Sequence, residues 1–187
     1  MPLTTLDPRT ALIVVDLQKG IVGLPVVHPV GEVVERARLL AEAFRRRGLP
    51  VVLVHVDGAP PGRTEQSRLR GALPDGFADL VPELAPKPGD HVVTKRTAGA
   101  FTRTDLEAYL RAHGVTQVVI VGVATSMGVE STARQAHELG FNVALPLDAM
   151  TDLDAELHAV TTTKLFPRLG ETGTTAEVLA LLEPRVP

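Results

Sequence analysis

The sequence predicts an α/β protein in which a mainly parallel sheet of about six strands lies between two layers of helices. Apolar runs of strand length alternate along the chain with segments whose apolar residues recur at helical spacing. The strand candidates are apolar almost throughout, which is typical of parallel strands buried on both faces. The chain has 187 residues, of which 44% are hydrophobic and 22% charged, so we expect a single domain over residues 1–187.

The first strand–helix–strand unit occupies the N-terminal part of the chain. Residues 11–18, ALIVVDLQ, form the first expected strand, and apolar residues over 30–44 predict the helix that follows. Residues 50–57, PVVLVHVD, form the second strand. Residues 58–90 are rich in Gly, Pro and charge, which predicts an irregular excursion with one short helix around 77–84.

The alternation continues through the middle of the chain. Residues 91–95, HVVTK, form the third strand. Thr104 and Glu107 have the spacing of a capping box, which predicts the start of a helix that Gly114 ends. Residues 116–124, TQVVIVGVA, form the fourth and most β-branched strand.

The last part of the chain predicts two more strands and three more helices. These are a helix with a narrow face of small residues over 129–136, a strand over 140–148, a helix from about Asp154, a short strand over 167–172, and a helix opened by a capping box of Thr174 and Glu177.

Composition and charge exclude several functional classes. The chain has no cysteine, so it has neither a disulfide framework nor a thiol nucleophile. The formal net charge is −3, and the basic cluster Arg45–Arg47 falls at an expected helix end, so we expect no nucleic-acid partner. The apolar runs are too short to span a membrane and the N-terminus is unlike a signal peptide, so we expect a cytoplasmic protein with a small-molecule substrate.

Several expected strands end in a charged residue. In parallel sheets, ligands bind beyond the carboxyl ends of the strands. Burial of Asp16 at the end of an apolar run would raise its pKa towards a range useful for acid–base catalysis, although it could instead cap the next helix. Lys95 could hold a substrate carboxylate, although it could also be a solvated lysine.

No pattern predicts a metal or a cofactor. The six histidines lack metal-ligand spacing, and the scattered glycine pairs lack the pattern of a phosphate loop. His55 and Asp57 share a strand face, for which a structural role is favoured over half of a metal site.

One stretch permits a serine mechanism. The sequence Ala124-Thr125-Ser126-Met127-Gly128 has the spacing of a nucleophile elbow, with alanine for the first glycine. Asp148 and His158 follow in serine–acid–histidine order. Short matches of this kind also occur by chance, and an oxyanion-loop motif is not evident.

Four stretches together, ALIVVDLQ, VVTKRTAGAF, VIVGVATSMGVESTARQAHELGFNVALPLDA and TTAEVL, resemble the isochorismatase-like hydrolase superfamily of isochorismatases, nicotinamidases and carbamoylsarcosine amidases. The resemblance covers nearly the whole chain and implies a Rossmann-like three-layer α/β/α sandwich that forms a homodimer or a higher homo-oligomer. It places Asp16 and Lys95 at the family's catalytic positions, and Gly128 where the family's amidases have a nucleophilic cysteine. It also implies substrate contacts; those we expect are Gln18, Phe101, Ala124, Thr125, Ser126 and Met127.

Glycine at position 128 removes the covalent amidase mechanism. The isochorismate-cleaving branch of the family is similar in having glycine there, because protonation of a vinyl ether needs an acid and no nucleophile. By this resemblance Asp16 donates the proton, Lys95 orients or binds a carboxylate, and Gly128 leaves room and offers its N–H. Burial of Asp16 favours the protonated form that this role needs, whereas a nearby Lys95 favours the ionised form.

Two other functions remain open. The protein could be an amidase that uses Ser126 or a water molecule, or a binding protein that has lost catalysis. Candidate side chains for binding substrate carboxylates are Arg63, Arg68 and Arg70 in the long excursion.

Overall fold

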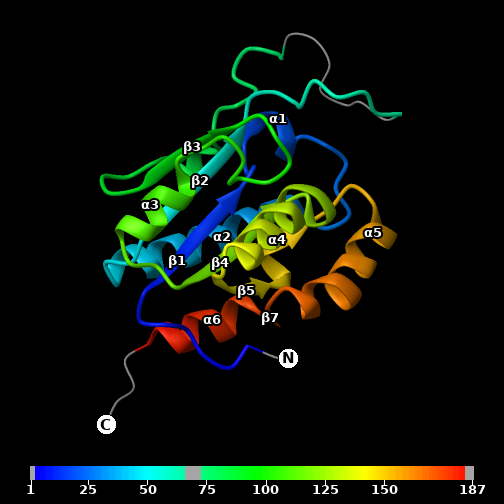
Figure 1. Cartoon of the computed structure of the whole chain (residues 1–187). Helices are drawn as coiled ribbons and strands as arrows, with labels where there is room; N and C mark the ends of the chain where they lie inside the picture. Colours follow the sequence, from blue (N-terminus) through cyan, green and yellow to red (C-terminus); the bar gives the residue numbers. More distant parts are fainter. Residues whose placement is uncertain (1–2, 66–72, 184–187) are drawn as a thin grey trace.

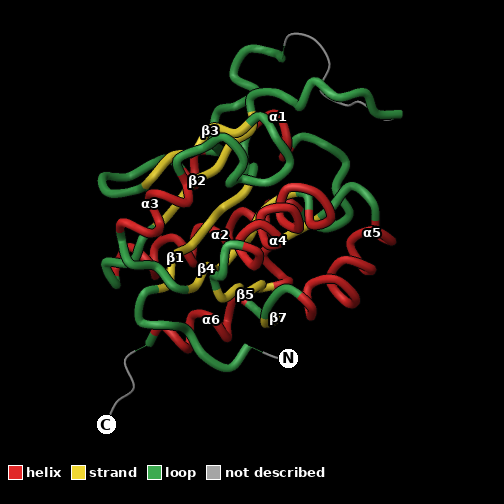
Figure 2. Tube along the Cα trace, in the orientation of Figure 1, coloured by secondary structure: helices red, strands yellow, loops and turns green. Residues whose placement is uncertain are grey.

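The computed structural model describes residues 3–65 and 73–183, and it confirms the predicted fold class. All strand pairings of the sheet are parallel, in the order β3-β2-β1-β4-β5-β7 with β6 beside β4. Figures 1 and 2 show the sheet running through the middle of the molecule between helices. The strands are β1 (Thr10–Val15), β2 (Val51–Val56), β3 (His91–Lys95), β4 (Gln117–Val123), β5 (Asn142–Pro146), β6 (Met150–Thr151) and β7 (Glu171–Gly173).

Helices cover both faces of this sheet. They are α1 (Lys19–Val22), α2 (Val30–Arg46), α3 (Leu106–Ala112), α4 (Glu130–Glu138), α5 (Ala155–Val160) and α6 (Thr175–Leu182), together with the π-helical turns η2 (Thr125–Val129) and η4 (Thr161–Leu165). One buried cluster joins α2 and α6 to one face, and a second joins α3 and α4 to the other. Figure 1 shows α3 and α4 in front of the sheet and α2 behind it.

Several expected boundaries were wrong. The first strand ends at Val15 rather than at residue 18, and Gln18 instead forms an isolated bridge with Leu80. Residues 3–65 and 73–183 form seven strands where about six were expected, because β6 has only two residues and leaves no periodic pattern. The four-residue helix α1 was missed for the same reason.

The two expected capping boxes have different outcomes. The box of Thr174 and Glu177 is confirmed, since each side chain bonds the other residue's backbone N–H, at 3.2 and 2.7 Å. The box of Thr104 and Glu107 is wrong: α3 has Asp105 at its N-cap. The Thr104 hydroxyl donates instead to the carbonyl of Ala100 at 2.6 Å.

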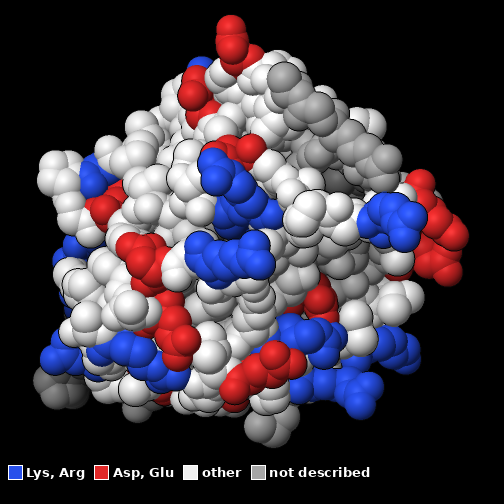
Figure 3. All heavy atoms as spheres, turned by 45° about the horizontal axis from the view of Figure 1, so that its top comes forward, with Lys and Arg blue, Asp and Glu red and all other residues white. Residues whose placement is uncertain are grey.

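The strands β1, β2, β3 and β4 all end at one edge of the sheet, which we call the carboxyl edge. Residues 58–65 and 73–81 of the long excursion lie near this edge at the top of Figure 1. Figure 3 turns this side forward and shows acidic and basic side chains interspersed on it. Within 3–65 and 73–183, no helix has the length and hydropathy needed to cross a membrane.

Candidate active site at the carboxyl edge

Asp16 is the first residue after β1 and has an unusual backbone conformation. Its φ is 53°, in the left-handed region that Asp and Asn adopt more readily than most other residues. Its N–H donates to the carbonyl of Val54 on the neighbouring strand at 2.9 Å. The chain thus turns sharply at Asp16, and the side chain is almost completely buried.

Lys95, the last residue of β3, points its ammonium at Asp16. The distance from Nζ to Oδ2 of Asp16 is 2.8 Å, and the two side chains are only 2% and 8% exposed. Nζ also donates to the carbonyls of Thr97 at 3.2 Å and Ala98 at 2.9 Å. An ammonium has three N–H groups, so this arrangement leaves Lys95 none for a substrate carboxylate. Its geometry fits the orientation of Asp16 rather than the binding of an anion.

Burial has a larger effect on the pKa of Asp16 than Lys95 has. Desolvation raises the pKa of Asp16 to about 6, although the charge and hydrogen bond of Lys95, and more weakly His55, act to lower it. Its second oxygen, Oδ1, is buried without a hydrogen-bond partner among the described residues. A buried carboxylate oxygen without a donor is costly, which favours a proton or a bound donor there. Asp16 can therefore hold a proton close to neutral pH.

Gly128 lies against this ion pair, in the turn η2. A Cβ at position 128 would be 3.0 Å from Val15 Cγ1, 3.1 Å from Asp16 Oδ2 and 3.1 Å from the carbonyl of Val123. These distances are too short for comfortable contact. Glycine here lets the turn approach Asp16 closely, and it leaves less room than we expected.

Two side-chain contacts fix the start of η2, which follows a cis peptide between Val123 and Ala124. The N–H of Ser126 donates to Oδ2 of Asp152 at 2.6 Å. Thr125 Oγ1 is 2.9 Å from Nδ1 of His158 on α5. Neither contact was predicted, because Asp152 and His158 are distant in sequence and no spacing pattern connects them to the turn.

A third contact holds the end of η2. The Thr132 hydroxyl donates to the carbonyl of Gly128 at 2.6 Å and accepts the N–H of Ala100 at 3.1 Å. This hydroxyl therefore ties the loop after Lys95 to the turn that carries Gly128.

The expected substrate contacts lie in different surroundings. Gln18 is fully buried, and its amide bonds the backbone of Val56 and Phe77, which makes it a brace between β2 and the excursion. Phe101 lies with its ring 6.1 Å from the ring of Phe141, and its N–H donates to the side-chain carbonyl of Gln135. Ala124, Thr125, Ser126 and Met127 begin η2 beside Gly128, and Met127 is 60% exposed. Substrate contact by these residues stays a prediction.

The structure does not assemble the serine triad. Asp148 accepts the N–H and hydroxyl of Thr175 at 2.7 and 3.0 Å, so it caps α6 instead of holding a histidine. His158 contacts Thr125 rather than Ser126. The serine–acid–histidine interpretation is therefore wrong in its geometry, although Ser126 itself lies next to the site.

The remaining candidate residues are distributed as follows. His55 contacts the carbonyl of Ala78 and the hydroxyl of Thr94, both at 2.7 Å, whereas Asp57 pairs with Arg96. Within the described residues, no group of three or more acidic or histidine side chains could hold a metal ion. Arg63 is exposed, and the other two arginines proposed for the excursion, Arg68 and Arg70, lie outside the described residues.

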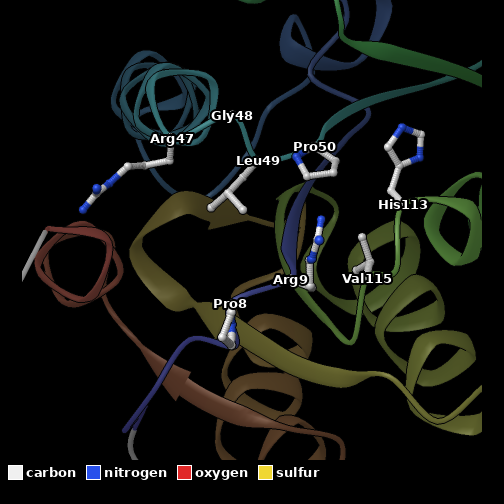
Figure 4. Close-up of a pocket in the computed structure, with 8 residues that line it drawn as sticks. All are labelled: Pro8, Arg9, Arg47, Gly48, Leu49, Pro50, His113 and Val115. Atoms are coloured by element: carbon white, nitrogen blue, oxygen red, sulfur yellow. The ribbon is translucent and has the colours of Figure 1, made fainter.

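A cavity of about 250 Å³ lies at the opposite, amino edge of the sheet. Figure 4 shows its lining residues, which are Pro8, Arg9, Arg47, Gly48, Leu49, Pro50, His113 and Val115. The C-caps of α2 and α3, Arg47 and His113, lie here, and a cation such as Arg47 stabilises the negative end of a helix dipole. These charges have a structural explanation, so the cavity is not the candidate active site.

Comparison with known proteins gives consistent matches. Residues 10–177 match the family model described as the isochorismatase domain. The chain is 40% identical over 178 residues to YwoC of Bacillus subtilis, an uncharacterized isochorismatase family protein, with 91% of this chain and 93% of YwoC covered. It is 39% identical over 145 residues to streptothricin hydrolase of Streptomyces noursei, covering 77% of this chain and 50% of that protein. The solved structure of an isochorismatase family protein from Burkholderia thailandensis superposes with a TM-score of 0.91 at 42% identity, covering 95% of this chain and 97% of that one.

Proposed function

This chain belongs to the isochorismatase family of hydrolases, and from that premise we propose that it hydrolyses a small carboxylated substrate by proton transfer from Asp16, without a covalent enzyme intermediate. We further propose that Gly128 occupies the position at which the family's amidases have their cysteine. The observation that carries the proposal is the buried Asp16, whose pKa is raised to about 6 while Lys95 holds one of its oxygens.

A vinyl ether of the isochorismate type suits this group. Asp16 would protonate the methylene carbon of the enol ether, which gives an oxocarbenium ion. Water then adds to that ion, and the hemiketal collapses to pyruvate and a ring diol. The acid proton is the only group the enzyme must supply to the reacting atoms, which fits a chain without cysteine.

Amide hydrolysis is the second candidate, favoured by the similarity to streptothricin hydrolase. In that case ionised Asp16 would act as a base on a water molecule, or Ser126 would attack the amide. The two candidates use opposite protonation states of Asp16, which makes them separable.

The deciding experiment measures pyruvate release from isochorismate by the wild-type protein, Asp16→Asn and Ser126→Ala. We expect release by the wild type, loss in Asp16→Asn, and most of the rate in Ser126→Ala. Loss in Ser126→Ala with activity kept in Asp16→Asn would reject the proposal. If the wild type releases no pyruvate but cleaves an amide from a panel, the second candidate replaces the first. Folding of each variant is checked by circular dichroism.

The resemblance also supports a homo-oligomer built from one domain per chain. Light scattering on the purified protein tests this, and a monomer at working concentration would contradict it.

A further inference from the structure

A carboxylated substrate needs a hydrogen-bond donor that Lys95 does not provide. All three N–H groups of Lys95 are directed at Asp16 and two carbonyls. The neighbouring Arg96 is also engaged, since it binds Asp57 through two bonds of 2.9 Å. The inference below rests on the proposed function, because it asks which group receives the substrate's carboxylate.

Two histidines from distant parts of the chain meet beside η2. His28 lies in the loop before α2 and His158 lies on α5, and their ring centroids are 4.6 Å apart with the planes at 60°. His28 is exposed and His158 is partly exposed, so both can be reached from solvent. His158 contacts Thr125, the first residue of the turn that ends at Gly128 and Val129.

Each histidine is held through Nδ1 by a buried threonine hydroxyl. Thr151 Oγ1 accepts the backbone N–H of His28 at 3.2 Å and is 3.0 Å from its Nδ1. This contact holds the ring through Nδ1, and Nε2 can donate to a ligand when it carries the ring proton. Thr125 holds Nδ1 of His158 in the same manner at 2.9 Å. Neither Nε2 atom forms a hydrogen bond with another residue of the described ranges 3–65 and 73–183.

We propose that His28 and His158 form a carboxylate-binding subsite of the active site, in which their Nε2–H groups donate to the carboxylate of the substrate. Two further observations support it. Desolvation, followed by the adjacent His28, lowers the pKa of His158, although the charge of Asp152 acts to raise it, so the ring is a neutral hydrogen-bond donor at neutral pH. Val27 and Leu157, which precede His28 and His158 in the chain, are exposed apolar side chains that would lower the polarity around a bound anion.

Direct binding is measured with malonate as the probe, by following the histidine Cε1–H resonances in NMR. We expect saturable shifts of His28 and His158 in the wild type and in Asp16→Asn, with His137 on the surface of α4 unmoved. The neutral diamide malonamide should leave all of them unchanged. Equal shifts with malonamide, or no shift of either histidine with malonate, would overturn the subsite.

Two substitutions of His158 separate ligand binding from structural support. His158→Asn keeps an amide near the Nδ1 position for Thr125 but removes the Nε2 donor, whereas His158→Gln keeps an amide near the Nε2 position. We expect about tenfold weaker malonate binding in His158→Asn, which corresponds to about 1.4 kcal/mol, and smaller losses in His158→Gln, which keeps a donor near the Nε2 position. Equal losses in both variants would indicate a purely structural histidine and contradict the proposal. His137→Asn is the matched control.

Turnover distinguishes failure of this subsite from failure of the proposed function. If pyruvate is released, His158→Asn should raise KM by about tenfold and leave kcat within about threefold, which is the pattern of uniform binding. If malonate binds to the pair but no vinyl ether is cleaved, the subsite stands and the proposed reaction falls. If vinyl ether is cleaved but the KM of His158→Asn is unchanged, the proposed reaction stands and the subsite is rejected.

Discussion

The two edges of the sheet carry cations in opposite settings. At the carboxyl edge, Lys95 and Asp16 are 2% and 8% exposed and lie 2.8 Å apart. At the amino edge, Arg9 and Arg47 line a cavity of about 250 Å³ but are exposed to solvent. Burial makes a charge sensitive to its neighbours, whereas water screens an exposed one. This difference in burial, rather than the size of a cavity, is the reason we propose the chemistry at the carboxyl edge.

The sharpest test of this contrast compares Asp16→Asn with Arg9→Gln. We expect Asp16→Asn to lower kcat/KM by about 10²–10⁴-fold, the usual contribution of a general acid, and Arg9→Gln to stay within about twofold. Steady-state kinetics on whichever substrate is turned over measures both. A similar loss in the two variants would remove the distinction between the edges.

Stability should show the same contrast. Lys95→Met leaves Asp16 buried without its cation, which is expected to lower the free energy of unfolding by about 3 kcal/mol, measured by urea denaturation above about pH 6. The loss should shrink below that pH, where Asp16 is protonated. Arg47→Met removes only an exposed side chain that donates to the carbonyl of Leu182, so we expect about 1 kcal/mol or less. Equal and pH-independent losses would contradict the assignment.

The pH dependence of turnover identifies the working form of Asp16. Because its pKa is raised to about 6, an acid role predicts a constant kcat/KM below that pH and a decrease of about tenfold per unit above it. A base role predicts the opposite: kcat/KM is constant above that pH and decreases below it. The folded-state pKa of about 6 lies above the unfolded value of 3.8, so folding takes up a proton between these two pH values, and stability falls as the pH rises from 3.8 to about 6. His158→Asn should leave the position of the limb unchanged, which excludes His158 as the titrating group.

The smallest expected effects on stability come from substituting one glycine at each edge of the sheet. Gly128→Ala places a Cβ within 3.0–3.1 Å of three neighbours, so we expect a loss of about 1–3 kcal/mol from overpacking. Gly48 at the amino edge has open space but a φ of 63°, so Gly48→Ala should cost about 1 kcal/mol from backbone strain. Asparagine tolerates positive φ and should restore most of the stability at position 48 but none at position 128. Urea denaturation measures all four variants, and restoration by asparagine at both positions would refute the packing argument.

Much of the fold could be predicted because long apolar runs dominate it. β3 spans residues 91–95 as expected, and α2 covers the predicted face. The errors concern short elements and local competition. β6 is too short to show a period, and the Thr104 hydroxyl bonds Ala100 instead of opening α3.

The candidate site was predictable only in part. Placing Asp16 and Lys95 at strand ends indicated that they would share an edge, and they do. The remaining two N–H groups of Lys95 bind loop carbonyls. This depends on the path of residues 96–98, which no periodic pattern encodes. The pairing of His28 with His158 depends on packing between segments 130 residues apart, so sequence spacing carries no signal for it.

The unequal oxygens of Asp16 have a stereochemical consequence. Lys95 holds Oδ2, so a proton carried by Asp16 sits on Oδ1, in one fixed direction relative to the sheet. A vinyl ether bound in a single pose would then be protonated on one face of its double bond only. Pyruvate formed in deuterated water from a substrate with stereospecifically tritiated methylene would have a chiral methyl group of one hand, recording the direction from which the acid approached.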